Sequence, residues 1–257
     1  MLRFKSLGSG STGNATLIET GEARPFRLLV DCGLGIRQLQ LRLADAGLLP
    51  GDVNAVFITH EHSDHVGCAR GLSLRHRIPV WMSRGTHLAI GEPDFDGLLR
   101  FARDGEAIAM SGLEVMPFTV PHDAREPLQL SCSDGNVKLG VLTDLGHATA
   151  HVLSHLESCN ALLLECNHDT DMLAQSAYPA FLKRRVGGLY GHLSNAAAAD
   201  ITRQLMHHRL KHLVAAHLSA QNNRADLPQG LLAEVLCCAN DDIVVAKPDA
   251  GTCWLDV

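Results

Sequence analysis

The chain has 257 residues, of which 46% are hydrophobic and 19% are charged, so it can bury one full-sized core without disulfides. This composition excludes a disordered, collagen-like or coiled-coil protein, and no apolar stretch approaches the roughly 18–20 residues that cross a bilayer. A formal net charge of −6 provides no overall positive field for nucleic acid. Because the amino terminus also lacks the apolar run of a signal peptide, we expect a cytoplasmic protein with no membrane partner.

Short apolar runs alternate with helical periodicity along the chain, which is typical of a layered α/β fold in one domain, residues 1–257. The periodicity across residues 36–46 predicts a helix that ends at Gly47. Asn195 is predicted to cap a second helix, whose apolar face includes Ala198 and Leu205. The apolar runs predict buried strands at residues 28–30, 55–59, 115–120, 139–143, 161–164 and 213–216.

A carboxylate or an imidazole follows each predicted strand, at the point where the strand ends. In chain order these residues are Asp31, His60, His122, Asp144, Glu165 and His217. Ligand sites in layered sheet proteins collect where strands stop and loops begin. We therefore expect these side chains to converge on one site, although they are distant in the sequence.

Histidine is unusually frequent, with 15 in the chain, and it is the commonest metal ligand. The densest cluster is THEHSDH, residues 59–65. In an extended segment residues two apart face the same way, so His60 and His62 can hold one cation while Asp64 and His65 face a neighbouring one. Imidazole and carboxylate ligands suit Zn²⁺, Mn²⁺ or Fe²⁺. The eight cysteines form no CxxC pair, and we expect them to be small buried side chains.

Several segments together resemble a known superfamily. LLVDCG, THEHSDH, VPHDA, LTDLG and AAHLS resemble the metallo-β-lactamase superfamily, which implies a four-layer αββα sandwich. SLGSGSTGN, GHLSN and HLSAQNN further resemble its YycJ/WalJ-type branch, which implies nuclease activity and DNA exonuclease activity in particular. The matching segments run from Ser6 to Asn223, which is most of the chain.

The resemblance also implies two divalent metal ions and assigns their ligands. The first ion is assigned to His60, His62 and His122, the second to Asp64, His65 and His217, with Asp144 bridging both. Asp31 matches the aspartate that accepts a hydrogen bond from a ligating histidine and so orients it. The five histidines are neutral and the two aspartates carry a charge of −2, whereas two divalent ions carry +4. The positive charge that remains suits a bridging hydroxide and an anionic substrate.

The catalytic residues implied by the resemblance are Asp64, His192 and Glu165. His192 stands at the mouth of the second predicted helix, and Glu165 ends an earlier strand. In phosphodiesterases of this fold such a pair helps to protonate the leaving oxygen, a contribution of about 10²- to 10⁴-fold for a poor alkoxide leaving group. The alternative for His192 is a histidine that only caps a helix or lines a loop.

Substrate contacts are predicted less directly. The Gly-rich segment 8–14 could line the cleft, with Ser11 and Asn14 touching phosphate. Asn222 and Asn223 either bind substrate or merely turn the chain.

Two features bear on a polymeric substrate. The most basic run is KRR at residues 183–185, which is interpreted as a solvated helix face rather than a nucleic acid contact. With only two Trp and two Tyr in the chain, side chains for base stacking are scarce.

The sequence thus predicts a binuclear metal-dependent phosphodiesterase, a nuclease similar to DNA exonucleases, with RNA as the other possible polymer and with the choice between exo- and endonuclease left open. One alternative is a thioester or lactone hydrolase of the glyoxalase II type, but a thiolate leaving group needs no acid such as His192. Another is a phosphodiesterase for small cyclic nucleotides, which the negative net charge favours over a long polyanion. A third alternative is a non-catalytic sensor of metal or nucleotide. The complete set of metal ligands argues against it, because a protein without catalysis would not need to keep all of them. The oligomeric state is left open.

Overall fold

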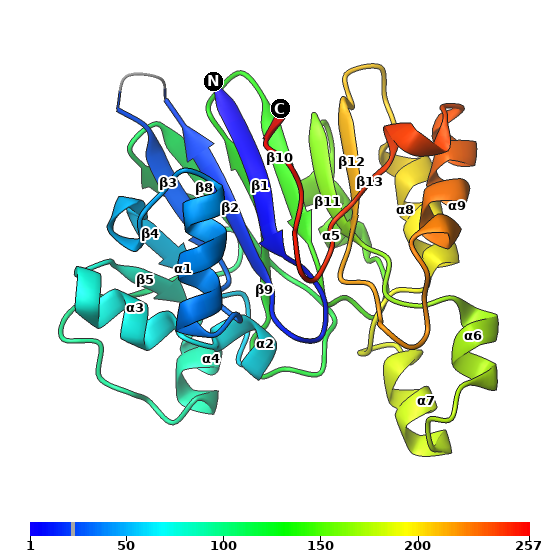
Figure 1. Cartoon of the computed structure of the whole chain (residues 1–257), viewed down its shortest axis with the longest axis horizontal. Coiled ribbons are helices and arrows are strands. Elements are labelled where there is room, and N and C mark those ends of the chain that lie inside the picture. The colour runs from blue at the N-terminus through cyan, green and yellow to red at the C-terminus, as the bar shows by residue number, and fades with distance from the viewer. Residues whose placement is uncertain (22–23) are drawn as a thin grey trace.

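The computed structural model describes the whole chain except residues 22–23. In the described residues two seven-stranded sheets pack face to face, with helices on their outer faces (Figure 1). The first sheet has the order β14 (Leu255–Asp256), β1 (Leu2–Gly8), β2 (Ala15–Thr20), β3 (Phe26–Val30), β4 (Ala55–Phe57), β5 (Val80–Met82), β6 (Leu99–Phe101). The second has the order β13 (Val244–Val245), β12 (His212–Ala216), β11 (Ala161–Glu165), β10 (Lys138–Leu142), β9 (Leu128–Ser133), β8 (Leu113–Thr119), β7 (Ile108–Met110).

Each sheet is antiparallel on one side and parallel on the other. Strands β1 to β3 pair antiparallel and β3 to β6 parallel, while β7 to β10 pair antiparallel and β10 to β13 parallel. Parallel neighbours need crossover connections, which helices supply here. The loops that follow β3, β4, β8, β10, β11 and β12 therefore open at one edge of the sandwich.

Helices cover both sheets. Those beside the first sheet are α1 (Ile36–Asp45), α2 (Ser63–Val66), α3 (Ala69–His76) and α4 (Arg84–Ala89); those beside the second are α5 (Ala150–Leu156), α8 (Asn195–Leu205) and α9 (Asp226–Leu236). Two short helices, α6 (Thr170–Gln175) and α7 (Ala180–Val186), project below α8 and α9 in Figure 1. Short 3₁₀ turns occur at Pro50–Asp52 and Asn240–Asp242. Within the described chain, none of the helices has the length and apolarity that a membrane crossing requires.

The core follows from the alternation of side chains along the strands. Leu28 and Val30 of β3 face the other sheet, whereas Leu29 faces the helices. On the helix side, Leu39 and Leu43 of α1 lie one turn apart and pack into the same cluster as Leu29. A third cluster joins the second sheet to α5, α8 and α9. The predicted four-layer αββα sandwich is confirmed.

The predicted strands are present, but several ends differ by one or two residues. The strand predicted over residues 55–59 stops at Phe57. The amide of Thr59 donates instead to Oδ1 of Asp31 at 2.9 Å, so Thr59 lies in a functional loop. The strand predicted over 139–143 likewise stops at Leu142.

The second predicted helix has a different cap. Ser194, not Asn195, is the cap residue of α8, and its Oγ accepts a hydrogen bond from the amide of Ala197 at 3.1 Å. Asn195 is the first helical residue, and its side chain donates to Oδ1 of Asn223 at 3.0 Å. The prediction chose the wrong one of two adjacent residue types that both favour caps.

The prediction of buried cysteines is correct for Cys32, 132, 159 and 166 and wrong for three others. Cys237, Cys238 and Cys253 are exposed, because they lie after the end of α9 and in the carboxyl-terminal segment instead of in a sheet. All eight are free, so the expected absence of a disulfide framework agrees with the described chain.

Candidate metal centre

All six residues predicted at strand ends lie at the same edge of the sandwich. Three of them, Asp31, Asp144 and His217, have left-handed backbone conformations, with φ values of 61°, 54° and 54°. Such conformations cost non-glycine residues of order 1–3 kcal/mol, and they cluster at functional sites. At each of these residues the left-handed conformation turns the chain sharply where the strand ends. The side chain is thereby directed toward the site, between the loops of the two sheets.

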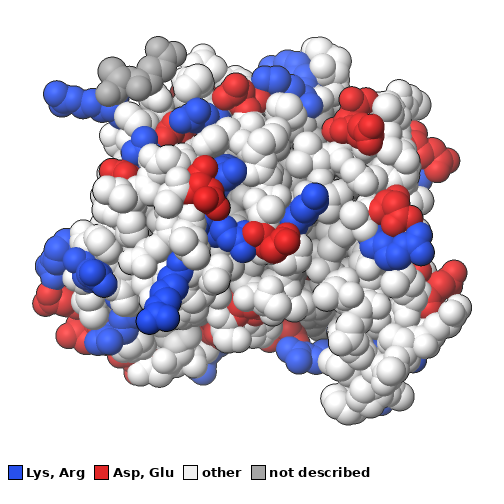
Figure 2. Space-filling view, viewed as in Figure 1, with Lys and Arg blue, Asp and Glu red and all other residues white. Residues whose placement is uncertain are grey.

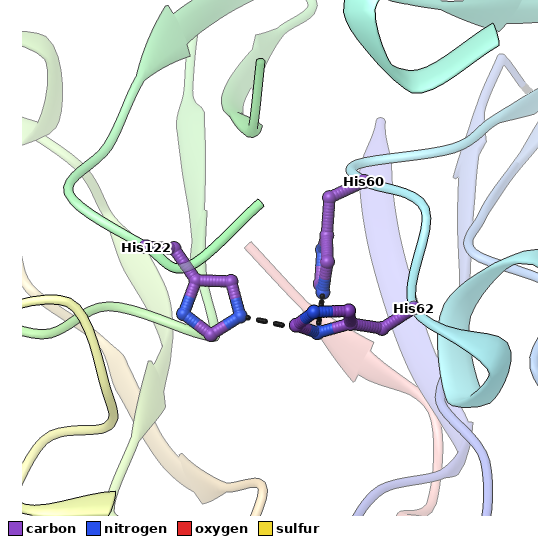
Figure 3. Close-up of side chains that lie close together, drawn as sticks. All are labelled: His60, His62 and His122. Carbon is purple, nitrogen blue, oxygen red and sulfur yellow. Dashed lines mark hydrogen bonds between the residues drawn. The ribbon is translucent and has the colours of Figure 1, made fainter. Parts of the chain in front are cut away.

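Three histidines form a first group of potential ligands. His60 and His62 come from the loop after β4, and His122 reaches them from the loop after β8 (Figure 3). Nε2 of His60 lies 3.0 Å from Nδ1 of His62, which lies 3.3 Å from Nε2 of His122. Nitrogens that bind Zn²⁺ tetrahedrally at about 2.0–2.1 Å are about 3.3 Å apart. The donor set and its spacing fit a divalent cation.

A second group lies beside the first. Oδ2 of Asp64 is 3.7 Å from Nε2 of His65 and 3.6 Å from Nε2 of His217. Asp64 and His65 lie in α2, and His217 follows β12. Nε2 of His217 is buried without a hydrogen-bond partner among the described residues. A buried ring nitrogen left unpaired is a further sign that this position suits a ligand.

Asp144 lies between the two groups. Its Oδ1 is 3.2 Å from Nδ1 of His217 and 3.9 Å from Nε2 of His122, while Oδ2 is 3.0 Å from Nε2 of His65. The carboxylate is buried, and Oδ2 makes no hydrogen bond with any described residue. Asp144 therefore reaches both groups, as a ligand shared by two cations must.

The electrostatics favour positive charge at this place. Burial alone would raise the pKa of Asp144, but His217 and His65 outweigh burial and hold that pKa well below its ordinary value. Burial would likewise lower the pKa of both histidines, but Asp144 outweighs it and raises the pKa of His65 well above its usual range and that of His217 to about 10. The buried carboxylates thus require compensating charge, which divalent cations would provide.

Asp31 supports the ligands from behind. Its carboxylate accepts hydrogen bonds from the amide and Oγ1 of Thr59 at 2.9 and 3.0 Å. Its Oδ2 lies 2.7 Å from Nδ1 of His65, which leaves Nε2 of that ring directed at Asp144. This is the geometry in which a carboxylate fixes the orientation of a ligating histidine.

His192 and Glu165 form a dyad next to Asp144. Nδ1 of His192 lies 2.8 Å from Oε1 of Glu165 and 3.5 Å from Oδ1 of Asp144. Glu165 is fully buried and also accepts from the amide of Leu145 at 2.8 Å. Burial would raise the pKa of Glu165, but His192 outweighs it and lowers that pKa to about 2; burial would lower the pKa of His192, but Glu165 raises it. The dyad therefore favours the protonated form of His192, whose ring is part of the cleft lining.

The site opens into a cleft of about 370 Å³. Its lining includes Asp64, Asp144, His192 and His217, and Ser11 of the Gly-rich segment.

Asn14 was predicted to touch substrate, but the structure buries it against the side chains of His65 and Asp64. It is buried, its Oδ1 accepts from the amide of Gly10 at 2.9 Å, and its Nδ2 lies 3.1 Å from Nε2 of His65. Asn14 therefore positions the ligand segment and does not line the cleft.

Asn222 and Asn223 are also buried and do not line the cleft. Nδ2 of Asn223 donates to the carbonyl of Cys166 at 2.8 Å, and the carbonyl of Asn222 accepts from the amide of Asp169 at 2.9 Å. These contacts tie the loops after β11 and β12 together, as expected of residues that turn the chain.

Sequence reasoning missed several residues at the site. Ser9 accepts a hydrogen bond from the amide of His217 at 2.8 Å, and Asp123, Tyr178 and Arg185 line the cleft. Asp123 directly follows a predicted ligand and could have been proposed from that position. Ser9 lies in the Gly-rich segment and Arg185 in the basic run, but neither pattern indicates these contacts, and Tyr178 carries no local motif.

The loop carrying Asp64 is packed so closely that it gives a stability test. A Cβ on Gly33 would lie 1.6 Å from the carbonyl oxygen of Asp64, which accepts from the amide of Asn14 at 2.8 Å. Gly33→Ala should lower the free energy of unfolding by about 3 kcal/mol because the backbone must move apart. Gly35→Ala is the matched control, since a Cβ there meets nothing within 4 Å. Equal urea midpoints for the two variants would contradict this packing.

Comparisons with known proteins agree with the fold. The family model described as the metallo-beta-lactamase superfamily matches residues 8–164. The chain is 35% identical to exodeoxyribonuclease YycJ of Bacillus anthracis over 91% of this chain and 89% of that protein. It is 28% identical to exodeoxyribonuclease WalJ of Streptococcus pneumoniae over 97% and 96%. The metallo-beta-lactamase fold protein YhfI of Bacillus subtilis superposes with a TM-score of 0.75 at 14% identity, with both chains fully covered.

The first relative covers nearly the whole chain at an identity that establishes common descent, and the family model spans the strands that carry most of the site. The chain therefore belongs to the metallo-β-lactamase superfamily, as a metal-dependent hydrolase related to YycJ and WalJ.

Proposed function

We propose that this protein is a binuclear metal-dependent phosphodiesterase that degrades nucleic acid from an end, with DNA preferred to RNA. The observation that carries the proposal is the His192–Glu165 dyad, 3.5 Å from Asp144 in the cleft onto which both ligand groups face. An acid at this position is needed for an alkoxide leaving group and not for a thiolate. The names of the two relatives, both exodeoxyribonucleases, support DNA as the substrate.

The cations would be held by the residues of the two groups. His60, His62 and His122 would hold the first, Asp64, His65 and His217 the second, with Asp144 shared. When bound, two ions of Zn²⁺, Mn²⁺ or Fe²⁺ polarise the phosphodiester and lower the pKa of bound water, so that a nucleophile is available near neutral pH. Asp64 lines the cleft, where it would also face the substrate.

The dyad supplies the proton that completes cleavage. Glu165 engages Nδ1 of His192, so the imidazole keeps one orientation with Nε2 toward the cleft. Because Glu165 is buried and ionised, it stabilises the protonated ring before the reaction. Nε2 of His192 would pass its proton to the departing oxygen as the P–O bond breaks.

A nuclease assay with reloaded protein tests the proposal. Chelator-stripped protein, with Mn²⁺ or Zn²⁺ restored, is incubated with 5′- and 3′-labelled DNA and RNA in single-stranded and duplex form. We expect mononucleotides released from one end of DNA, faster than from RNA, and none without metal. Hydrolysis of a thioester with no cleavage of any phosphodiester would contradict the proposal. Hydrolysis of a cyclic nucleotide alone would restrict it to a small substrate and contradict the nuclease assignment.

A further inference from the structure

A wall of exposed aromatic and basic side chains stands beside the cleft. It consists of residues 178–190, which comprise α7 and its flanking turns, and we call it the α7 wall. The chain's two tyrosines both belong to it: Tyr178 lines the cleft, and Tyr190 lines an adjoining pocket. Phe181, Leu189 and Tyr190 are 66%, 67% and 62% exposed, among the most exposed large apolar residues described. In Figure 1 α6 and α7 project below the sandwich, and the face of this region that Figure 2 shows is mostly white, with few charged side chains.

Positive charge lies on the same wall. Phe181, Arg184 and Arg185 are spaced at i, i+3 and i+4 on α7 and share one helical face. Nε of Arg185 donates to Oδ2 of Asp123 at 2.5 Å, yet the arginine side chain remains 60% exposed and its other nitrogens bond no described residue. Lys183 differs, because its Nζ donates to the carbonyl of Ala174 at 2.6 Å and so turns toward α6.

The wall continues directly from the cleft. An adjoining pocket of about 260 Å³ shares Asp123, Arg185 and Gly191 with the cleft lining. The rest of that pocket includes Arg184 and Tyr190. An aromatic ring and a second guanidinium therefore lie in the pocket next to the cleft. A chain that leaves the cleft past Arg185 therefore meets these two side chains next.

The wall is fixed firmly to the site. The carbonyl of Tyr190 accepts from the amide of Asp123 at 2.9 Å, and the amide of His192 donates to the carbonyl of Val186 at 2.8 Å. A Cβ on Gly146, two residues after Asp144, would lie 2.0 Å from the carbonyl oxygen of Leu189. This close approach holds the turn after α7 against the loop of the shared ligand, so the wall has a defined position relative to the reacting atoms.

These features fit an unpaired nucleotide chain. Exposed aromatic rings stack on unpaired bases, and arginine binds phosphates through parallel N–H groups. A cleft of about 370 Å³ with buried ligands suits a strand end and leaves no room for a double helix. We propose that the α7 wall binds the nucleotides next to the one being cleaved on a single-stranded end, with Tyr190 stacking on a base and Arg184 and Arg185 contacting phosphates. This inference rests on the proposed function.

The length dependence of turnover tests the inference. The test variant is Arg184→Gln combined with Tyr190→Ala. The control is Arg209→Gln combined with Met206→Ala, which removes the same charge and an exposed apolar side chain before the amino end of β12. Substrates are bis-p-nitrophenyl phosphate, thymidine dinucleotide and longer oligothymidylates.

For wild type we expect kcat/KM to rise with oligonucleotide length beyond the dinucleotide. The test variant should lose at least about tenfold on the longer chains, mainly through KM, because one stacked base and one phosphate contact are removed. Its slope of log KM against log salt should fall by about 0.7. Its kcat/KM on the small diester should stay within about twofold, and the control variant should match wild type on every substrate.

Three results would overturn the inference: a wild-type rate that does not depend on length, an unchanged length dependence in the test variant, or an equal loss on the small diester. Failure of the proposed function is separate, because reloaded wild type would then hydrolyse no phosphodiester of any size.

Discussion

An Asp144→Asn protein should lose about three orders of magnitude or more in kcat/KM for bis-p-nitrophenyl phosphate. Asp144 is buried and its carboxylate reaches both ligand groups, so replacing it with a neutral amide removes a negative charge that both groups share. The cations stabilise the transition state by several kcal/mol, and each 1.4 kcal/mol of that stabilisation corresponds to about a tenfold change in rate. Losing the cations therefore costs about three orders of magnitude or more. The metal content of reloaded protein should fall at the same time. Asparagine is chosen because it tolerates the left-handed φ of 54° better than alanine.

Asp96→Asn provides a matched control for this substitution. Asp96 has nearly the same backbone conformation, with φ of 53°, but it is exposed and pairs with Arg77 away from the site. That variant should keep wild-type rate and metal content. Full activity of the Asp144→Asn protein, measured at saturating metal, would be incompatible with a shared carboxylate ligand.

His192→Gln should lower kcat by about 10²- to 10⁴-fold on a dinucleotide, whose leaving group is an alkoxide. On bis-p-nitrophenyl phosphate the loss should be within about tenfold, because p-nitrophenolate departs without a proton. Metal content should remain at the wild-type level, since His192 is held by Glu165 and belongs to neither of the proposed ligand sets. Steady-state kinetics on the two substrates, with elemental analysis of the same samples, measures all three quantities.

The control for this variant is His208→Gln, which changes an exposed histidine near the amino end of β12. It should leave both rates unchanged. Equal losses on the two substrates in the His192→Gln protein would assign this residue to the structure of the site and not to proton transfer.

The sequence predicted the site better than it predicted the elements around it. Asp31, His60 and Asp144 could be found because each ends a run of apolar residues, and hydrophobic runs are the strongest local signal of a buried strand. Strands such as β1 (Leu2–Gly8) and β5 (Val80–Met82) were not predicted. The first alternates apolar and polar residues, a strand pattern that a criterion of continuous apolar runs does not detect, and the second is too short for a pattern to emerge.

The roles of buried polar residues could not be predicted in the same way. Asn14 and Asn223 each stand in a motif beside ligands, and a motif does not say which way an amide points. Asn14 contacts a ring nitrogen of His65, and Asn223 donates to the carbonyl of Cys166, so both contacts involve segments remote in the sequence. The positions of Tyr178 and Tyr190 beside the cleft could not be predicted from the sequence either. The position of Tyr190 depends on how the turn after α7 packs against Gly146.

Anomalous diffraction at the zinc absorption edge, from crystals of zinc-reloaded protein, locates the bound cations. We expect two peaks, one among His60, His62 and His122 and the other among Asp64, His65 and His217, with Asp144 between them. A surface group of potential ligands formed by Asp104, His151 and His155 serves as an internal comparison. The absence of any peak between the strand-end loops, or a peak at that surface group alone, would contradict the account.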